Sequence, residues 1–176
     1  MHVLIFIPNF ATIAKPLRAI SRQRVPFVWD SEQEASYQEL KQQLAKAPVL
    51  AYFDKEAHTR VIADARPVGL GAVLVQEKND VGRAVCYASR SLSSVERRYS
   101  QTEKEALALV WACERFNQYL YGLQTFDLVT DHEALKVIYS RGSKPSPRIE
   151  RWVLRLQPYS YKVCCVASRE IGRAHV

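Results

Sequence analysis

The chain has 176 residues, of which 48% are hydrophobic and 24% are charged, and it contains six glycines and eight prolines. This composition is typical of a globular protein and excludes a disordered, collagen-like or disulfide-scaffold chain. No apolar run approaches the roughly 18 to 20 residues needed to span a bilayer, so we expect no membrane segment. The apolar run at positions 3–7 is too short for a signal peptide, which predicts an intracellular, cytoplasmic protein.

The distribution of charge indicates which class of partner the chain could bind. The net charge is +7, and residues 132–176 hold nine basic and three acidic side chains, so the C-terminal quarter is the basic part. A basic segment of this kind suits a polyanion such as nucleic acid, although many basic domains bind none.

The four cysteines lack the spacing of a zinc site. We expect them to be reduced thiols (Cys86, Cys113, Cys164 and Cys165).

The first half of the chain predicts one helix and three strands. Ser31 with Glu34 three residues on forms a capping box, and the apolar residues that follow at helical spacing stop at Pro48. Strand-like runs then alternate with short turns, which predicts an antiparallel meander over 59–63, 69–76 and 83–89.

The second half predicts helices that alternate with two strands. Two overlapping capping boxes, which begin at Ser100 and Thr102, open the longest helix, and its apolar stripe continues to Gly122. The other elements are a strand over 125–130, a short helix after His132, a helix over 148–156 and a strand over 159–166. This order predicts an α/β fold with a mixed sheet, antiparallel at one edge and parallel at the other, and helices on its faces.

Three acidic residues lie at the ends of otherwise apolar elements. Asp64 closes the first strand of the sheet, Glu105 lies in the first turns of the long helix, and Asp131 follows the fourth strand. If a crossover makes the first and fourth strands neighbours, the two aspartates lie side by side and Glu105 points toward them. Three converging carboxylates form a magnesium site, and a pair of such ions is the usual device for hydrolysing a phosphodiester.

Each acid also has a simpler interpretation. Glu105 could be an acid near a helix N-terminus, favoured by the helix dipole, and Asp131 could cap the next helix. Asp64 could form a turn before Pro67. The spacing of the residues leaves these alternatives open.

Six ordered motifs connect these acids to a known family. They read Val-Ile-Ala-Asp-Ala at 61–65 with Gly-Leu-Gly-Ala-Val-Leu at 69–74, Tyr-Ala-Ser-Arg-Ser-Leu at 87–92, Tyr-Ser-Gln-Thr-Glu-Lys-Glu at 99–105, Tyr-Leu-Tyr-Gly at 119–122 and Thr-Asp-His-Glu-Ala-Leu at 130–135. Together they closely resemble the ribonuclease H domain of gypsy-like LTR-retrotransposon polyproteins. Upstream, Phe-Ile-Pro-Asn-Phe at 6–10 and Phe-Val-Trp at 27–29 resemble the segment that joins the polymerase part of such a reverse transcriptase to its nuclease.

The resemblance implies a ribonuclease H-like mixed five-stranded sheet with flanking helices, preceded by a helical connecting arm. It implies that Asp64, Glu105 and Asp131 bind two Mg²⁺ or Mn²⁺ ions and cleave the RNA strand of an RNA:DNA hybrid. Residues 1–50 would then be the connecting segment, residues 51–166 the nuclease domain without its final helix, and residues 167–176 an unrelated tail. Besides the RNA:DNA hybrid, the expected partner is the polymerase portion of the parent polyprotein. The expected location is the cytoplasm, where a virus-like particle could enclose the protein.

Basic residues of the chain suit a nucleic-acid substrate. Arg148, Arg151 and Arg155 share one face of the last predicted helix and would contact backbone phosphates, with a solvated helix face as the alternative. Trp152 on the same helix is either a core residue or a platform on which a base stacks.

Three departures from the family pattern qualify the function. Arg66 stands where the family has a small hydroxyl residue, and this cation would contact the hybrid or disturb the metal site. The family has a fourth metal-binding aspartate after the last strand, but Glu170 is the only acid after Val166, and we do not assign it that role. No Tyr-x-Asp-Asp motif occurs, so we expect no polymerase activity. The alternative to a nuclease is a catalytically inactive module of the same fold that binds nucleic acid or another protein.

Overall fold

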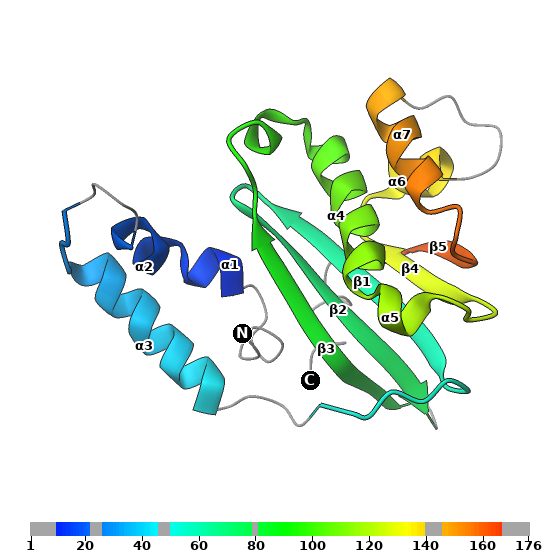
Figure 1. The fold of residues 1–176 in the computed structure, drawn as a ribbon, viewed down its shortest axis with the longest axis horizontal. Coiled ribbons are helices and arrows are strands. Elements are labelled where there is room, and N and C mark those ends of the chain that lie inside the picture. The colour runs from blue at the N-terminus through cyan, green and yellow to red at the C-terminus, as the bar shows by residue number, and fades with distance from the viewer. Residues whose placement is uncertain (1–9, 22–25, 46–49, 79–80, 140–145, 167–176) are drawn as a thin grey trace.

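A five-stranded mixed sheet forms the centre of the computed structural model, which describes residues 10–21, 26–45, 50–78, 81–139 and 146–166 (Figure 1). The spatial order of the strands is β3-β2-β1-β4-β5. Their bounds are β1 His58–Arg66, β2 Gly69–Lys78, β3 Val81–Ser91, β4 Phe126–Thr130 and β5 Tyr161–Cys165. All five expected strands are therefore present, and the mixed sheet of the sequence prediction is confirmed.

The direction of each strand also follows the prediction. β1 and β2 pair antiparallel, as do β2 and β3, whereas β4 runs parallel to both β1 and β5. The register between β2 and β3 shifts after Leu74, where β3 carries an irregularity. Because the chain leaves β3 for a helix before it returns as β4, the fourth strand joins the sheet beside the first.

The long helix that connects β3 to β4 is interrupted once. α4 spans Gln101–Arg115 and α5 spans Asn117–Leu120, with Phe116 between them outside helical geometry at φ −98° and ψ 13°. The sequence prediction of one continuous helix is therefore wrong at this point. Phe116 and Leu120 are 2% and 1% exposed, so the break keeps both side chains in the core.

Only one of the two expected capping boxes forms at the start of α4. The Ser100 side chain accepts from the N–H of Glu103, and the Glu103 carboxylate accepts from the N–H of Ser100. Thr102 instead shares a hydrogen bond with His132, and Glu105 turns toward β1. The second box is absent because both of its members bind other elements.

The main core lies between the sheet and the helices α4 to α7. The later helices are α6, Glu133–Ile138, and α7, Pro147–Arg155, which lie beyond α4 on the side away from β3 (Figure 1). Val61, Leu109 and Leu128 are fully buried in this core. Trp152 is 8% exposed and packs 6.0 Å from the ring of Tyr99, which favours the core interpretation of this tryptophan. A smaller apolar cluster around Ile62 and Tyr87 lies on the opposite sheet face.

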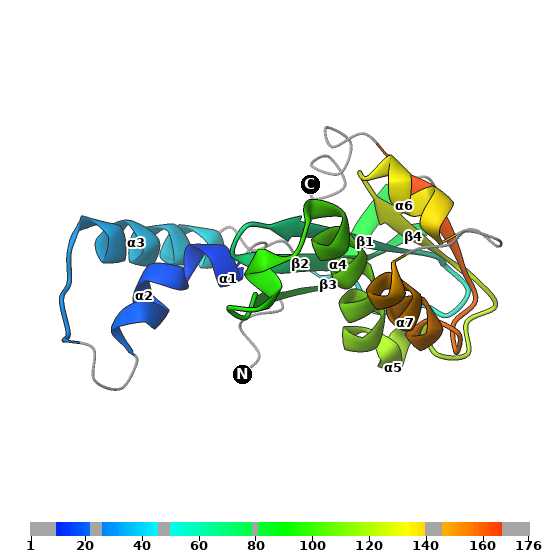
Figure 2. The ribbon, with the colours of Figure 1, turned by 90° about the horizontal axis from the view of Figure 1, so that it is seen from above.

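A helical arm lies beside β3, on the left in Figure 1 and in the view from above in Figure 2. It consists of α1, Phe10–Ile13, α2, Lys15–Ile20, and α3, Ser31–Ala45. The sequence predicted only the third of these helices, because the first two are too short to show a period. The Ala11 N–H donates to Ser89 Oγ and the Arg18 guanidinium to Ser91 Oγ, so the arm is attached to the end of β3.

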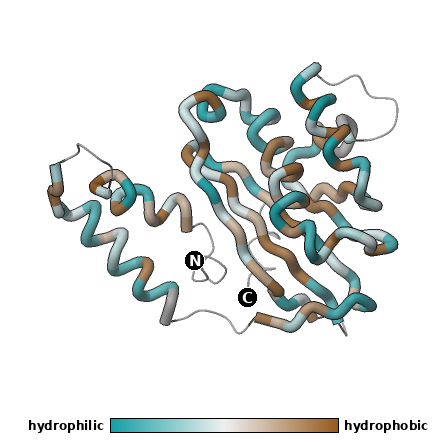
Figure 3. The backbone as a smooth tube through the Cα atoms, viewed as in Figure 1, coloured by the Kyte–Doolittle hydropathy of each residue, from teal (hydrophilic) through white to brown (hydrophobic). Residues whose placement is uncertain are grey.

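The third arm helix begins slightly differently from its prediction. The N–H of Asp30 donates to Gln33 Oε1, while the Glu34 carboxylate accepts from the indole N–H of Trp29. The expected box of Ser31 with Glu34 is thus replaced by contacts one residue earlier. Figure 3 shows that α3 is largely hydrophilic, in contrast to the strands.

Some sequence expectations lie outside the described residues. They concern the motif at 6–10 up to residue 9, the helix end near Pro48, the centre of the turn at 79–80, the loop that contains Pro145, and the tail at 167–176 with Glu170. In the part of the chain that the structure describes, no helix is long and apolar enough to cross a membrane.

Candidate metal centre

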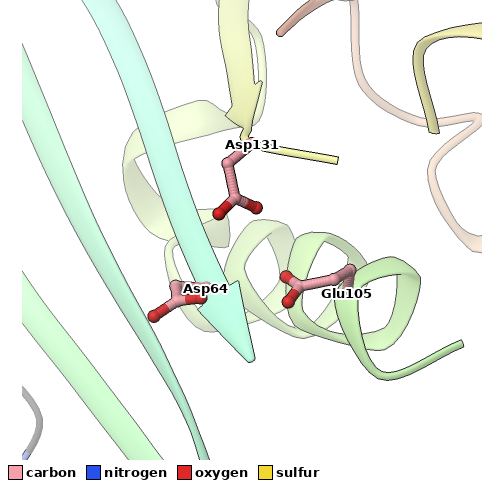
Figure 4. A group of neighbouring side chains, drawn as sticks. All are labelled: Asp64, Glu105 and Asp131. Carbon is pink, nitrogen blue, oxygen red and sulfur yellow. The ribbon is translucent and has the colours of Figure 1, made fainter. Parts of the chain in front are cut away.

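The three predicted acids converge at one end of the sheet. Asp64 lies near the end of β1, Asp131 follows β4 directly, and Glu105 reaches the same place from α4 (Figure 4). One carboxylate oxygen from each residue lies within 4.8 Å of those of the other two. The structure thus brings together all three candidate residues, from elements that are far apart in sequence.

Strand pairing explains the position of the two aspartates. In the parallel pair of β1 and β4, Val61 is opposite Leu128 and Ile62 is opposite Val129. Continuing this register by two residues sets Asp64 opposite Asp131. The buried apolar pairs therefore fix the register of β1 against β4. The two aspartates lie just beyond the last of these pairs.

Glu105 is the most enclosed member of the group. It is 3% exposed, and its Oε2 accepts from the backbone N–H of Ala65, 3.1 Å away. Its Oε1 accepts from Gln101 Nε2 at 2.6 Å, and the same amide group donates to the carbonyl of Ala65. These bonds fix the carboxylate of Glu105 relative to β1 before any ligand binds.

The surroundings of Glu105 oppose its ionisation. Burial, followed by repulsion from Asp64 and Asp131, raises the pKa of Glu105 from 4.5 to about 7, against smaller effects from its two hydrogen bonds. A divalent cation would compensate the negative charges that cause this repulsion.

This shift predicts how stability depends on pH in the absence of metal. Folded Glu105 holds its proton more tightly than Glu105 of the unfolded chain does. The protonated side chain therefore stabilises the fold fully below about pH 4.5, and this stabilisation is lost as the pH rises to about 7. Urea unfolding in a chelator should show this decline for the natural chain. Glu105→Gln should be less sensitive to pH over the same interval, and equal pH dependence of the two proteins would contradict the prediction.

The simpler interpretations of Asp64 and Glu105 find little support. Asp64 is inside β1, paired with Gly71, and not in the turn that follows. The role of an acid in the first helical turn belongs to Glu103, which forms the capping box. Neither Asp64 nor Glu105 is therefore needed for the local structure that would otherwise explain it.

Arg66 lies directly beside the acidic group. Its Nε donates to Asp64 Oδ2 at 2.9 Å, and the side chains of Arg66 and Asp64 are 58% and 31% exposed. The cation anticipated from the sequence is therefore in contact with one of the three carboxylates.

The arginines of α7 are exposed, but two of them have acidic partners on α4. Arg148 pairs with Glu103 at 2.6 Å and lies 4.3 Å from the centre of the Tyr99 ring. Arg155 makes two bonds to Glu114, at 2.7 and 2.6 Å. Arg151 donates to the carbonyl of Pro147 and has no ion pair with a described residue. Among the described residues, Arg148 and Arg155 are each neutralised by a carboxylate of α4, whereas the charge of Arg151 is not.

Two polar residues near the centre were not identified from the sequence. Gln101 precedes Glu105 by four residues, a spacing that places both on one face of α4 and could have indicated the contact. His132 follows Asp131, and its Nε2 lies 3.2 Å from Thr102 Oγ1, which joins the end of β4 to the start of α4. Its Nδ1 is buried without a hydrogen-bond partner among the described residues.

The donor set fits a hard divalent cation. Among the described residues, the group contains three carboxylates and neither histidine nor cysteine. Carboxylate oxygens are preferred by Mg²⁺ and Mn²⁺ over softer metals. Asp64, Glu105 and Asp131 are therefore the residues that would hold such an ion.

Comparison with known proteins gives a consistent result. A family model described as "RNase H-like domain found in reverse transcriptase" matches residues 54–159. The chain is 35% identical to the Pol polyprotein of transposon 297 and 31% identical to that of transposon gypsy, both from Drosophila melanogaster, over 94% and 90% of its length. It is also 31% identical over 90% of its length to the transposon Tf2-3 polyprotein of Schizosaccharomyces pombe. The chain spans only 15%, 16% and 12% of these three relatives, respectively.

Solved structures show the same fold. A foamy viral protease-reverse transcriptase in complex with dsDNA matches 94% of this chain and 35% of its own, with a TM-score of 0.72 and 20% identity. A foamy viral protease-reverse transcriptase in complex with an RNA/DNA hybrid matches 92% of this chain and 23% of its own, with a TM-score of 0.69 and 19% identity. The matched motifs, the sheet order and the acidic centre thus lead to one conclusion: the chain belongs to the family of RNase H-like domains found in reverse transcriptases.

Proposed function

We propose that this domain hydrolyses the RNA strand of RNA:DNA hybrids, with two Mg²⁺ or Mn²⁺ ions bound by Asp64, Glu105 and Asp131. The observation that carries the proposal is the convergence of three carboxylates, from β1, α4 and the end of β4, within 4.8 Å of one another. Family membership supports the same class of reaction.

Each residue of the centre would have a distinct part. Divalent ions, when bound, lower the pKa of a coordinated water and stabilise the leaving oxygen of a phosphodiester. Glu105 is positioned by Ala65 and Gln101, so it provides a ligand that needs little reorganisation. Asp64 and Asp131 lie at the carboxyl ends of β1 and β4, where a phosphate backbone can approach.

The setting of the domain is part of this proposal. The curated relatives are polyproteins, and we infer that this domain acts beside the polymerase portion of such a protein. Residues 1–50 would then connect the two parts, and residues 51–166 would form the nuclease-like domain. The same setting suggests a cytoplasmic location, including the interior of a virus-like particle.

The substrate would be bound through its backbone and not through its bases. RNA:DNA hybrids are recognised largely by shape, phosphates and 2′-hydroxyl groups. Arg66, Arg148, Arg151 and Arg155 are the proposed phosphate contacts. Because Arg148 and Arg155 are paired with acids of α4, Arg151 offers the most available charge on that helix.

Charge reversal on α7 should distinguish these arginines. Arg151→Glu is expected to weaken hybrid binding and to reduce the steepness of its salt dependence by about the amount of one to two phosphate contacts. Arg155→Glu should also place a like charge beside Glu114, so it is expected to destabilise the packing of α7 on α4. Hybrid affinity over a series of salt concentrations tests this, and an unchanged slope in Arg151→Glu would show that this residue does not contact phosphate.

A second candidate function is a binding module without catalysis. The observation that favours it is the ion pair of Arg66 with Asp64, which places a cation against a carboxylate of the metal centre. Such a module would bind the hybrid in the absence and presence of metal without cleaving it.

Removal and return of metal separates the two functions. The chain is incubated with a hybrid labelled on the RNA strand and with one labelled on the DNA strand, first in a chelator and then in Mg²⁺ or Mn²⁺. A nuclease should cleave only the RNA strand, and only after metal is added. Binding without cleavage under all conditions would reject the nuclease and leave the binding module.

A further inference from the structure

We propose that Arg66 is a built-in counter-ion of the metal centre, which must leave Asp64 before that carboxylate can bind a divalent cation fully. The inference rests on the proposed metal function and concerns how much metal the centre requires. Its basis is the contact of Arg66 Nε with Asp64 Oδ2, which are 2.9 Å apart and exposed to solvent.

Strand geometry makes this contact a fixed feature of the chain. Residues two apart in a strand point to the same sheet face, so Asp64 and Arg66 are placed side by side by β1 itself. The last pair of the hairpin joins Arg66 to Gly69 across a turn of only two residues. This turn is closely packed, since a Cβ on Gly69 would lie 3.0 Å from the carbonyl oxygen of Arg90. The backbone of Arg66 is therefore held where its guanidinium can always reach Asp64.

The guanidinium and a metal ion would compete for the carboxylate of Asp64. An ion bound through Asp64 Oδ2 would take the acceptor that Arg66 uses, and the two positive charges would repel each other. Because the side chain of Arg66 is 58% exposed, it can turn into solvent when the ion enters. Exposed ion pairs are weak, so the competition should raise the metal requirement without closing the centre.

Equilibrium binding of Mn²⁺ in the absence of nucleic acid tests this directly. Free Mn²⁺ is measured by electron paramagnetic resonance during titration of the natural chain, Arg66→Ser, Arg66→Lys and Asp64→Asn. We expect Arg66→Ser to bind Mn²⁺ roughly threefold to tenfold more tightly than the natural chain, and Arg66→Lys to show a smaller gain. Folding of every variant is checked by circular dichroism.

Lys78→Ser is the matched control. Lys78 also belongs to an exposed ion pair, with Asp54 at 3.2 Å, but it lies at the other end of β2 from the Gly69 turn. The variant lowers the net charge by the same amount as Arg66→Ser, so it corrects for a general electrostatic effect. Its Mn²⁺ affinity should match that of the natural chain.

The outcomes separate this proposal from the proposed function. If Arg66→Ser binds Mn²⁺ no more tightly than the natural chain or Lys78→Ser, while Asp64→Asn loses binding, the counter-ion role is wrong and the metal centre stands. If the natural chain, Arg66→Ser and Asp64→Asn bind Mn²⁺ equally, both the metal centre and the role of Arg66 are wrong.

Discussion

Asp64→Asn is expected to reduce metal-dependent cleavage of an RNA:DNA hybrid by more than about a hundredfold. The substitution removes a ligand charge at nearly constant volume, and loss of even an outer-shell group at a metal site costs about 10- to 100-fold. The Asp64 side chain is 31% exposed and lies near the end of β1, so the fold should be kept. Initial rates of cleavage in Mg²⁺, measured beside circular dichroism of both proteins, test the expectation.

A matched variant shows whether the effect is specific to the centre. Asp54→Asn also removes an exposed carboxylate from an ion pair, but Asp54 pairs with Lys78, away from the three acids. This control should cleave like the natural chain. Equal rates for Asp64→Asn and the natural chain would remove Asp64 from the mechanism.

Phe126→Ala is expected to lower the free energy of unfolding by about 3 to 5 kcal/mol. Phe126 is fully buried at the start of β4, and its ring lies 6.3 Å from the rings of both Tyr159 and Tyr161. The substitution therefore leaves a cavity between β4 and the residues around β5. Because a domain of this size is stable by only about 5 to 15 kcal/mol, this is a large fraction of the total.

Urea unfolding of three proteins tests the role of this ring. Phe126→Leu keeps most of the apolar volume and should cost less than half as much as Phe126→Ala. If Phe126→Ala lowered the free energy of unfolding by less than about 1 kcal/mol, β4 would not depend on the packing of this ring against Tyr159 and Tyr161. Some other contact would then have to hold Asp131 in place, which follows Phe126 by five residues.

Much of the fold could be predicted from local patterns. Hairpin-linked apolar runs indicated β1 to β3, the capping residue Ser100 marked the start of α4, and a helical crossover placed β4 beside β1. The convergence of Asp64 with Asp131 follows from that neighbour relation and from the register of the two strands. The reason is that strand order and register are set by which apolar residues can be buried together.

The parts that could not be predicted depend on contacts between distant residues. The break at Phe116 is invisible in the apolar stripe, because both halves of the helix keep the same buried face. The pairing of Arg148 and Arg155 with acids of α4 depends on how two helices pack. The attachment of Ala11 to Ser89 joins residues 78 positions apart and has no local signal.

Within the candidate centre, residue types were easier to predict than their environment. The three acids could be selected because each interrupts or ends an apolar element. The raised pKa of Glu105, in contrast, depends on its burial and on its closeness to two other carboxylates. Gln101 and His132 were missed because amides and imidazoles at such positions are common on ordinary helices and loops. The contact of Arg66 with Asp64 could be anticipated, since residues two apart in a strand share a face.

The most direct measurement is anomalous X-ray diffraction from crystals of the chain bound, in Mn²⁺, to an RNA:DNA hybrid whose RNA strand resists hydrolysis. The account predicts manganese density contacted by the carboxylates of Asp64, Glu105 and Asp131 and by a phosphate oxygen of the RNA strand. Hybrid bound elsewhere on the domain, with no manganese at these three acids, would contradict it.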